Sequence, residues 1–191
     1  VTGLTGESPF FVLSYASFLY NGISYNNLIA AQLENAAFVS MGPTTIDFGN
    51  IQVFYPSFNT SAFSTTYSAC TSFSAPELIY MTLAFGLIAN SLTNFSMPKL
   101  LHCAVGFAFV SSSLTTLSLP SVLTLGALTL TMSSLSTLSM PALTLLTGAF
   151  SSTLAAVTTF NMVSLITVVG AFNPVMAALT TFSVPALKTV T

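Results

Sequence analysis

From residue 69 onward, apolar and polar positions recur along the chain at a fixed spacing. The octet S-L-T-T-L-S-L-P at Ser113–Pro120 has five relatives, which begin at Ala69, Ser91, Ser134, Ala156 and Ala178. The starts of the six octets are 22, 22, 21, 22 and 22 residues apart. Because so constant a period is typical of stacked repeats, the pattern predicts a solenoid in which each copy forms one coil.

Within each octet, alternating apolar and polar residues predict a short strand. Leu117 and Leu119 are two residues apart and are expected to point into the core, while Thr116 and Ser118 point outward. Stacked coils would pair identical strands in parallel and bury two apolar columns. The first column is Phe73, Phe95, Leu117, Leu138, Phe160 and Phe182, and the second is Ala75, Met97, Leu119, Met140, Met162 and Val184. The proline that follows lacks an N–H group and is expected to end the strand.

A second apolar segment follows each octet. Apolar residues return after the proline position, at Leu78, Leu100, Val122, Leu143, Leu165 and Leu187, and again at Cys103, Leu125, Leu146, Val168 and Val190. A glycine then follows, at Gly86, Gly106, Gly126, Gly148 and Gly170, and we expect it to permit the tight turn that closes the coil. A seventh octet, at Gly49–Pro56, lies off the period.

The chain therefore divides into residues 1–68, which show no repeat, and a solenoid over residues 69–191 with six copies, the last incomplete. The first part is rich in aromatic residues and predicts an irregular N-terminal cap or docking segment, since an open solenoid end exposes core and strand edges. One short helix is expected over Asn27–Met41, with Asn26 as its N-cap and Gly42–Pro43 ending it. The stop at Thr191, inside a repeat, suggests a fragment or an end covered by another subunit.

The composition is poor in charge. Charged residues are 3% of the chain, where an ordinary soluble domain carries about 25%. The net charge of −2 leaves no basic surface, so nucleic acid is not an expected partner. The mean hydropathy of +0.86 favours either a membrane protein or a subunit whose surface is largely covered. A membrane is an unlikely partner, because the longest apolar stretch, Leu78–Ala89, is shorter than the roughly 20 residues of a spanning helix.

Candidate catalytic residues are scarce. His102 is the single histidine and lies beside Cys103, a pair that could form a thiol nucleophile. Neighbouring residues on a strand point to opposite sides, however, so both are assigned structural roles, as is Cys70 in the core. Glu77 and Lys99 occupy the same slot in adjacent coils and predict an exposed ion pair. Without a phosphate loop, a metal-spaced cluster or paired carboxylates, the sequence predicts no enzyme, no cofactor and no metal site.

The repeat resembles the leucine-rich-repeat family, specifically its BspA-like type, whose units resemble L-x-x-L-x-L-P-x-L-x-x-I-G-x-x-A-F. Residues that match this frame are Leu114, Leu117, Leu119, Pro120, Val122 and Leu125, and then Val157, Phe160, Met162, Leu165, Val168, Gly170, Ala171 and Phe172. The resemblance covers residues 69–191, although the glycine shifts register in the first three units and Val163 replaces one proline. It implies a mainly β, right-handed solenoid of short parallel strands with about 22 residues per coil. The family is found in bacterial surface proteins, protist proteins and phage or virion proteins, so the resemblance also implies recognition or assembly and not a reaction.

The outward octet positions form the candidate binding face. They are Ser72, Asn94, Thr116, Thr137, Thr159 and Thr181 in one column, and Ser74, Ser96, Ser118, Ser139, Asn161 and Ser183 in the other. The leading hypothesis is a non-enzymatic structural or adhesive protein on a virion (a phage tail, fibre or capsid accessory) or on a cell exterior. Its expected partners are other proteins, further copies of itself, or a surface glycan. Two alternatives stay open, an integral membrane protein and a soluble glycan- or ice-binding module.

Overall fold

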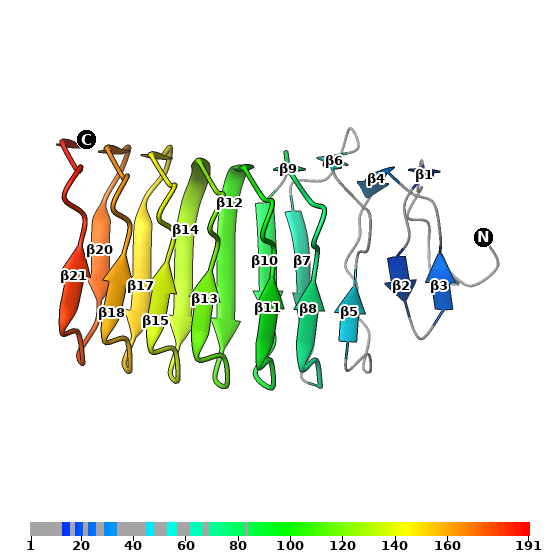
Figure 1. Cartoon of the computed structure of the whole chain (residues 1–191), viewed down its shortest axis with the longest axis horizontal. Helices are drawn as coiled ribbons and strands as arrows, with labels where there is room; N and C mark the ends of the chain where they lie inside the picture. The colour runs from blue at the N-terminus through cyan, green and yellow to red at the C-terminus, as the bar shows by residue number, and fades with distance from the viewer. Residues whose placement is uncertain are drawn as a thin grey trace.

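In the computed structural model, the chain folds into coils that are stacked along one axis (Figure 1). The structure describes residues 69–82 and 84–191, together with the backbone of the strands between residues 13 and 66 and the side chain of Asp47. All elements of this described part are strands, and every strand pair downstream of residue 69 is parallel. Equivalent residues of adjacent coils are about 22 positions apart, as in the pairing of Phe85 with Phe107. The predicted β-solenoid is therefore confirmed.

Each complete coil carries three strand positions. The octet strands are β8 (Ser72–Ser74), β11 (Asn94–Ser96), β13 (Thr116–Ser118), β15 (Thr137–Ser139), β18 (Thr159–Asn161) and β21 (Thr181–Ser183). The second strands are β9 (Tyr80–Met81), the first part of β12 (His102–Ser111) and of β14 (Thr124–Met132), β16 (Leu145–Leu146), β19 (Thr167–Val168) and β22 (Thr189–Val190). The third strands are β10 (Ala84–Ile88), the remainder of β12 and of β14, β17 (Phe150–Leu154) and β20 (Phe172–Val175).

The core fills the space between these strands, and both predicted apolar columns line it. Register pairs Phe73 with Phe95, Leu117 with Leu138, and Leu138 with Phe160. The third strands add a facing column, which consists of Phe85, Phe107, Leu128, Phe150 and Phe172. Each fully buried leucine or phenylalanine contributes roughly 1.5–3 kcal/mol. The coils thus stay together because each one buries apolar columns that it could not bury alone.

Two predictions upstream of residue 69 are wrong. Residues Ile29–Leu33, placed in a helix by the sequence, form strand β4, which pairs in parallel with β6 (Val53–Pro56) and antiparallel with β1 (Leu13–Tyr15). Helix propensity is a weak preference, and here the strand hydrogen bonds of the growing sheet override it. The rest of the expected helix lies outside the described residues. The off-period octet is also misassigned, because β6 pairs with the second strand β9.

The true octet position in that coil belongs to β5 (Thr45–Asp47), where Ile46 pairs in parallel with Phe73. Likewise, β7 (Ala62–Thr66) pairs in parallel with the third strand β10. Further upstream, β2 (Phe18–Tyr20) pairs antiparallel with β3 (Ile23–Tyr25) and with β5. Parallel pairing therefore continues across residue 69. The antiparallel pairs of the described strands, β1 with β4 and β2 with β3 and β5, all lie upstream of it.

The repeated glycines do not all close turns, which corrects the sequence prediction. Gly86, Gly106 and Gly126 lie within the strands β10, β12 and β14, and among the described glycines only Gly170 has a positive φ, of 112°. Gly126 is required for another reason. A bulge in β12 sets Ala104 and Val105 against it, and a Cβ atom at this position would overlap the carbonyl oxygen of Val105.

Candidate functional site

All twelve predicted face residues lie on octet strands, and none of them is buried. Strand alternation places them there, because the residue between the two outward positions points inward; it is fully buried in four of the six octet strands, as at Leu117 and Leu138. We call the outward side of β8, β11, β13, β15, β18 and β21 the octet face. Its predicted residues carry hydroxyl or amide groups, repeated once per coil.

A third row of hydroxyl groups runs beside these two columns, and the sequence prediction missed it. The row consists of Thr71, Thr93, Thr115, Ser136, Thr158 and Thr180, one residue before each octet strand. Four of its hydroxyls donate to the carbonyl oxygen of the equivalent residue one coil earlier, from Thr93, Ser136, Thr158 and Thr180, at 3.1, 3.0, 3.3 and 2.9 Å. The recurrence of Ser or Thr at this position was the available signal. This hydroxyl row therefore reinforces the stack from coil to coil.

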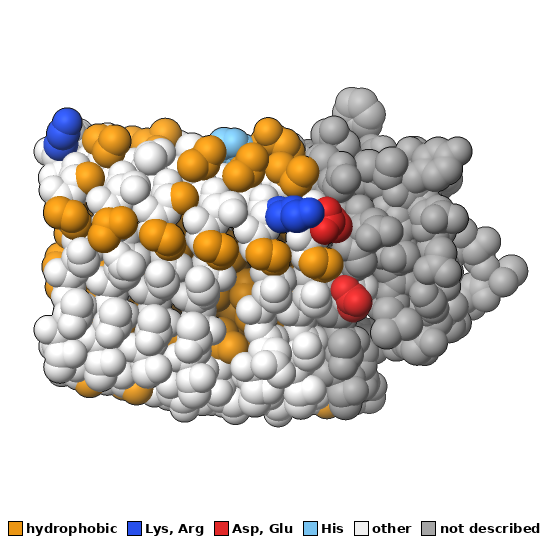
Figure 2. Space-filling view, in the orientation of Figure 1, with side chains coloured by type: hydrophobic (Ala, Val, Ile, Leu, Met, Phe, Trp, Pro, Cys, Tyr) orange, Lys and Arg blue, Asp and Glu red, His pale blue; other side chains and the backbone are white. Residues whose placement is uncertain are grey.

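Charge is almost absent from the octet face. The predicted ion pair is present, since Nζ of Lys99 lies 2.6 Å from Oε2 of Glu77, but both side chains sit in the turn beyond the strand. Such an exposed pair contributes little to stability. Asp47 stands in register with Ser74 and adds one carboxylate at the upstream edge of the face. Figure 2 shows the rest of this face as a white surface of polar side chains and backbone.

The His102–Cys103 pair cannot act as a nucleophile and base. Nδ1 of His102 lies 2.6 Å from Oγ1 of Thr124, and its ring stacks on Tyr80 with the ring centroids 5.1 Å apart. The thiol of Cys103 points the other way, into the core, and donates to the carbonyl of Gly106. Burial raises the pKa of this thiol to about 11, which keeps it protonated at neutral pH. Burial also raises the pKa of Cys70, which is fully enclosed in the core.

The octet strands do not form one continuous sheet. In the described chain, β11 ends a five-stranded sheet and β13 begins a four-stranded one, so no pairing joins the two strands. We call this interruption the open junction and the paired interface of β13 with β15 the closed junction. Figure 2 shows the open junction as a hollow in the octet face with hydrophobic side chains at its floor. Phe95 is only half-buried here, whereas Phe73, Leu117 and Leu138 are fully buried.

Within the described residues, no group of three or more potential metal ligands occurs, and no helix is long and apolar enough to cross a membrane. Comparison with protein-family models, with curated proteins and with solved structures gave no match. The resemblance to leucine-rich repeats accordingly stays a prediction. The octet face and its open junction are the surface features from which a function can be inferred.

Proposed function

We propose that the chain is a non-enzymatic binding or assembly module and that the octet face is the surface that meets the partner. The observation that carries this proposal is the pair of outward columns, in which Ser, Thr and Asn side chains repeat from coil to coil on a fully packed core. Adjacent strands are about 4.8 Å apart, so the hydrogen-bonding groups repeat at that interval. A partner that offers uncharged polar groups at a similar interval fits this face best.

The face is also built to bind with a small loss of entropy. Short side chains such as Ser, Thr and Asn have few rotamers to lose, and immobilising a longer, more flexible side chain costs about 0.5–1.5 kcal/mol. The neighbouring hydroxyl row holds the backbone in place, as in the bond from Thr180 to the carbonyl of Thr158. Protein surfaces, further copies of the chain and surface glycans are the partner classes that match. A place on a virion or cell exterior is proposed on the leucine-rich-repeat resemblance alone.

A matched pair of double variants tests the proposal. Thr116→Glu with Thr137→Glu puts two carboxylates on the octet face, at register partners of adjacent coils. The control is Thr131→Glu with Thr153→Glu, which places the same two charges on exposed register partners of the third strands. Binding is measured on a glycan array, and self-association is measured by light scattering after size-exclusion chromatography.

We expect the wild type and the third-strand control to bind or self-associate equally, and the octet variant to lose about 10-fold or more in affinity, which corresponds to roughly 1.4 kcal/mol. Equal losses in the two double variants would assign the effect to charge in general and would contradict a role for the octet face. A wild-type chain that stays monomeric and binds no glycan would remove self-assembly and glycan binding from the proposal.

A further inference from the structure

The open junction has the properties of a peptide-binding site. We propose that one extended peptide segment docks between β11 and β13 and joins the octet sheet as an additional parallel strand. The site would recognise the peptide mainly through its backbone, so this inference holds whether or not the hydroxyl columns that form its rims also meet a partner. Strand addition to a free sheet edge is an established mode of peptide recognition, and here two facing edges are free.

The first argument is the set of backbone groups that remain unpaired across the open junction. At the closed junction, the amides of Ser136 and Thr137 donate to the carbonyl of Thr115, at 2.8 and 3.2 Å. At the same place, the amide of Leu119 donates to the carbonyl of Ser139 at 3.0 Å.

The equivalent groups at the open junction form no such bonds in the described structure. The amide of Thr116 does not reach the carbonyl of Thr93, and the amide of Met97 does not reach the carbonyl of Ser118. The hydroxyl row is interrupted at the same place, because no bond from the Thr115 side chain joins it to Thr93. Both edges therefore present donors and acceptors in the register that a parallel strand requires.

The floor and the rims of the open junction define the chemistry of the peptide. Half-buried Phe95 at the floor offers an apolar contact for one inward side chain. Asn94, Ser96 and Thr116 are exposed at the rims and carry no charge, so small uncharged residues fit on either side of the apolar one. The expected ligand is an extended segment of the type Thr-Thr-Leu-Ser, the sequence of residues 115–118, because every paired octet strand places Leu or Phe between Ser, Thr or Asn residues.

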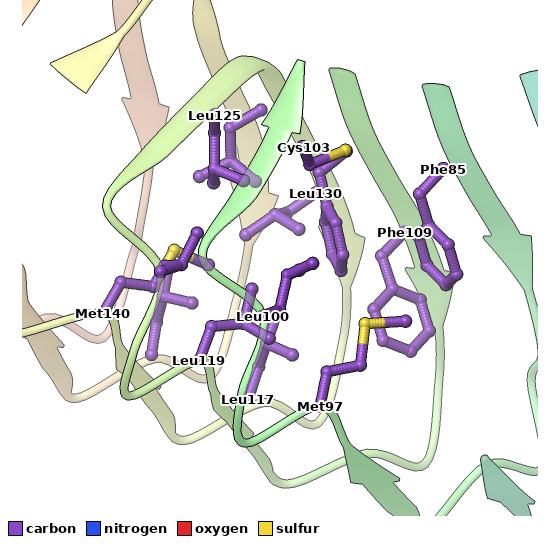
Figure 3. Close-up of a cluster of buried hydrophobic side chains, with 14 of the residues drawn as sticks. Phe85, Met97, Leu100, Cys103, Phe109, Leu117, Leu119, Leu125, Leu130 and Met140 are labelled. Atoms are coloured by element: carbon purple, nitrogen blue, oxygen red, sulfur yellow. The ribbon is translucent and has the colours of Figure 1, made fainter. Parts of the chain in front are cut away.

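The rest of the coil stays paired while the octet side is apart. On the second-strand side, the amides of Leu123 and Thr124 both donate to the carbonyl of Leu101, at 2.8 and 3.2 Å. On the third-strand side, β12 and β14 remain paired beyond the bulge that faces Gly126. Figure 3 shows the core behind the junction, with Met97 and Phe109 on one side and Leu117 and Leu119 on the other. The two adjacent coils are thus hydrogen-bonded through their second and third strands and unpaired at their octet strands, so the site between β11 and β13 is open on the octet face.

The test uses the intact chain and a fluorescein-labelled peptide, Ser-Leu-Thr-Thr-Leu-Ser-Leu-Pro, with fluorescence anisotropy as the readout. We expect saturable binding to the wild type. A peptide of the same sequence with N-methyl groups on alternate amides cannot complete a ladder and should bind about 10-fold more weakly or worse, since each lost hydrogen bond contributes roughly 1 kcal/mol. Thr116→Pro removes a donor from the junction without altering a core side chain and should weaken binding to a similar extent.

Val184→Pro is the control at the other free edge of the four-stranded octet sheet, where it removes the amide that corresponds to that of Met97 and alters a side chain packed against the core. This variant should bind the peptide as the wild type does. The proposal is overturned by an absence of saturable binding up to about 1 mM, a concentration that corresponds to only about 4 kcal/mol of binding free energy. Equal affinity of the N-methylated peptide, or loss of binding in Val184→Pro together with retention in Thr116→Pro, would overturn it as well. The N-methyl comparison needs only the wild-type protein, so it decides the matter even if Thr116→Pro does not fold.

Discussion

The strands that flank the open junction and those that flank the closed junction have nearly the same sequence. Only the strands at the closed junction are hydrogen-bonded to each other. The strand β11 is Asn-Phe-Ser, β13 is Thr-Leu-Ser and β15 is Thr-Leu-Ser. The local pattern favours pairing equally at both interfaces. We infer that the difference comes from how the coils fit across the core, where Phe95 of β11 stands in place of the leucine found in β13 and β15.

The two coils that meet at the open junction differ in the size of their buried residues. The coil of β11 carries Phe107 and Phe109 on its third strand, and register sets them against Leu128 and Leu130 of the next coil. Phe95 packs on the same cluster, with its ring centroid 4.9 Å from that of Phe109. We infer that this step from two phenylalanines to two leucines on the third strand changes the width of the coil across the core, so that the two coils do not pair along all three strand positions. The bulge in β12 takes up part of the mismatch, and the unpaired octet strands take up the rest.

The largest expected effect comes from the bulge. Gly126→Ala should destabilise the fold by about 3 kcal/mol, because its Cβ atom would overlap the Val105 carbonyl and only the backbone could move. Gly106→Ala is the control on the neighbouring coil, where the nearest atom to the added Cβ is the Ala127 carbonyl oxygen at 3.4 Å. It should cost less than about 1 kcal/mol. Equilibrium unfolding in urea measures both values, and similar costs would show that the bulge does not fix the spacing of these coils.

Proline at equivalent strand positions compares the two junctions directly. Thr137→Pro removes an amide that donates to the Thr115 carbonyl at 3.2 Å and should cost about 2 kcal/mol. Thr116→Pro removes an amide that makes no bond across the open junction and should cost less than about 1 kcal/mol. The same unfolding measurement applies. If Thr116→Pro proves as costly as Thr137→Pro, then β11 and β13 are paired in solution.

Leucine in place of phenylalanine tests whether aromatic width opens the junction. Phe95→Leu makes its position match Leu117 and Leu138, so the two octet strands should approach each other and pair. Hydrogen exchange of the Thr116 amide should slow by about 5-fold as it gains a partner, since one hydrogen bond is worth roughly 1 kcal/mol. Phe73→Leu, at a paired interface, should leave this amide unchanged. Unaltered exchange in Phe95→Leu would assign the opening to the bulge alone.

These comparisons also mark how far the sequence could predict the structure. The inward columns, the buried Cys103 and the Lys99–Glu77 pair follow from strand alternation and a constant period, both of which are local. The open junction does not, because it depends on how three strand positions fit across the core. The spacing of the glycines does not reveal it either, because Gly106 and Gly126 are 20 residues apart, but so are Gly86 and Gly106, whose coils have paired octet strands. The strand at Ile29–Leu33 was missed for a related reason, since pairing with distant β6 decides its conformation.

The smallest expected effect on stability comes from Ser152, which stands in register with Leu130 of the preceding coil and occupies a position in the same inward column. The hydroxyl of Ser152 is buried and has no hydrogen-bond partner, so it carries an uncompensated desolvation cost. Ser152→Ala should therefore stabilise the fold by about 1 kcal/mol. Ser111→Ala is the control, because the buried Ser111 hydroxyl accepts a bond from the amide of Leu114 at 3.3 Å. Its loss should destabilise by a similar amount. Thermal unfolding should show the two melting temperatures moving in opposite directions, and a fall in both would mean that Ser152 has a partner in solution.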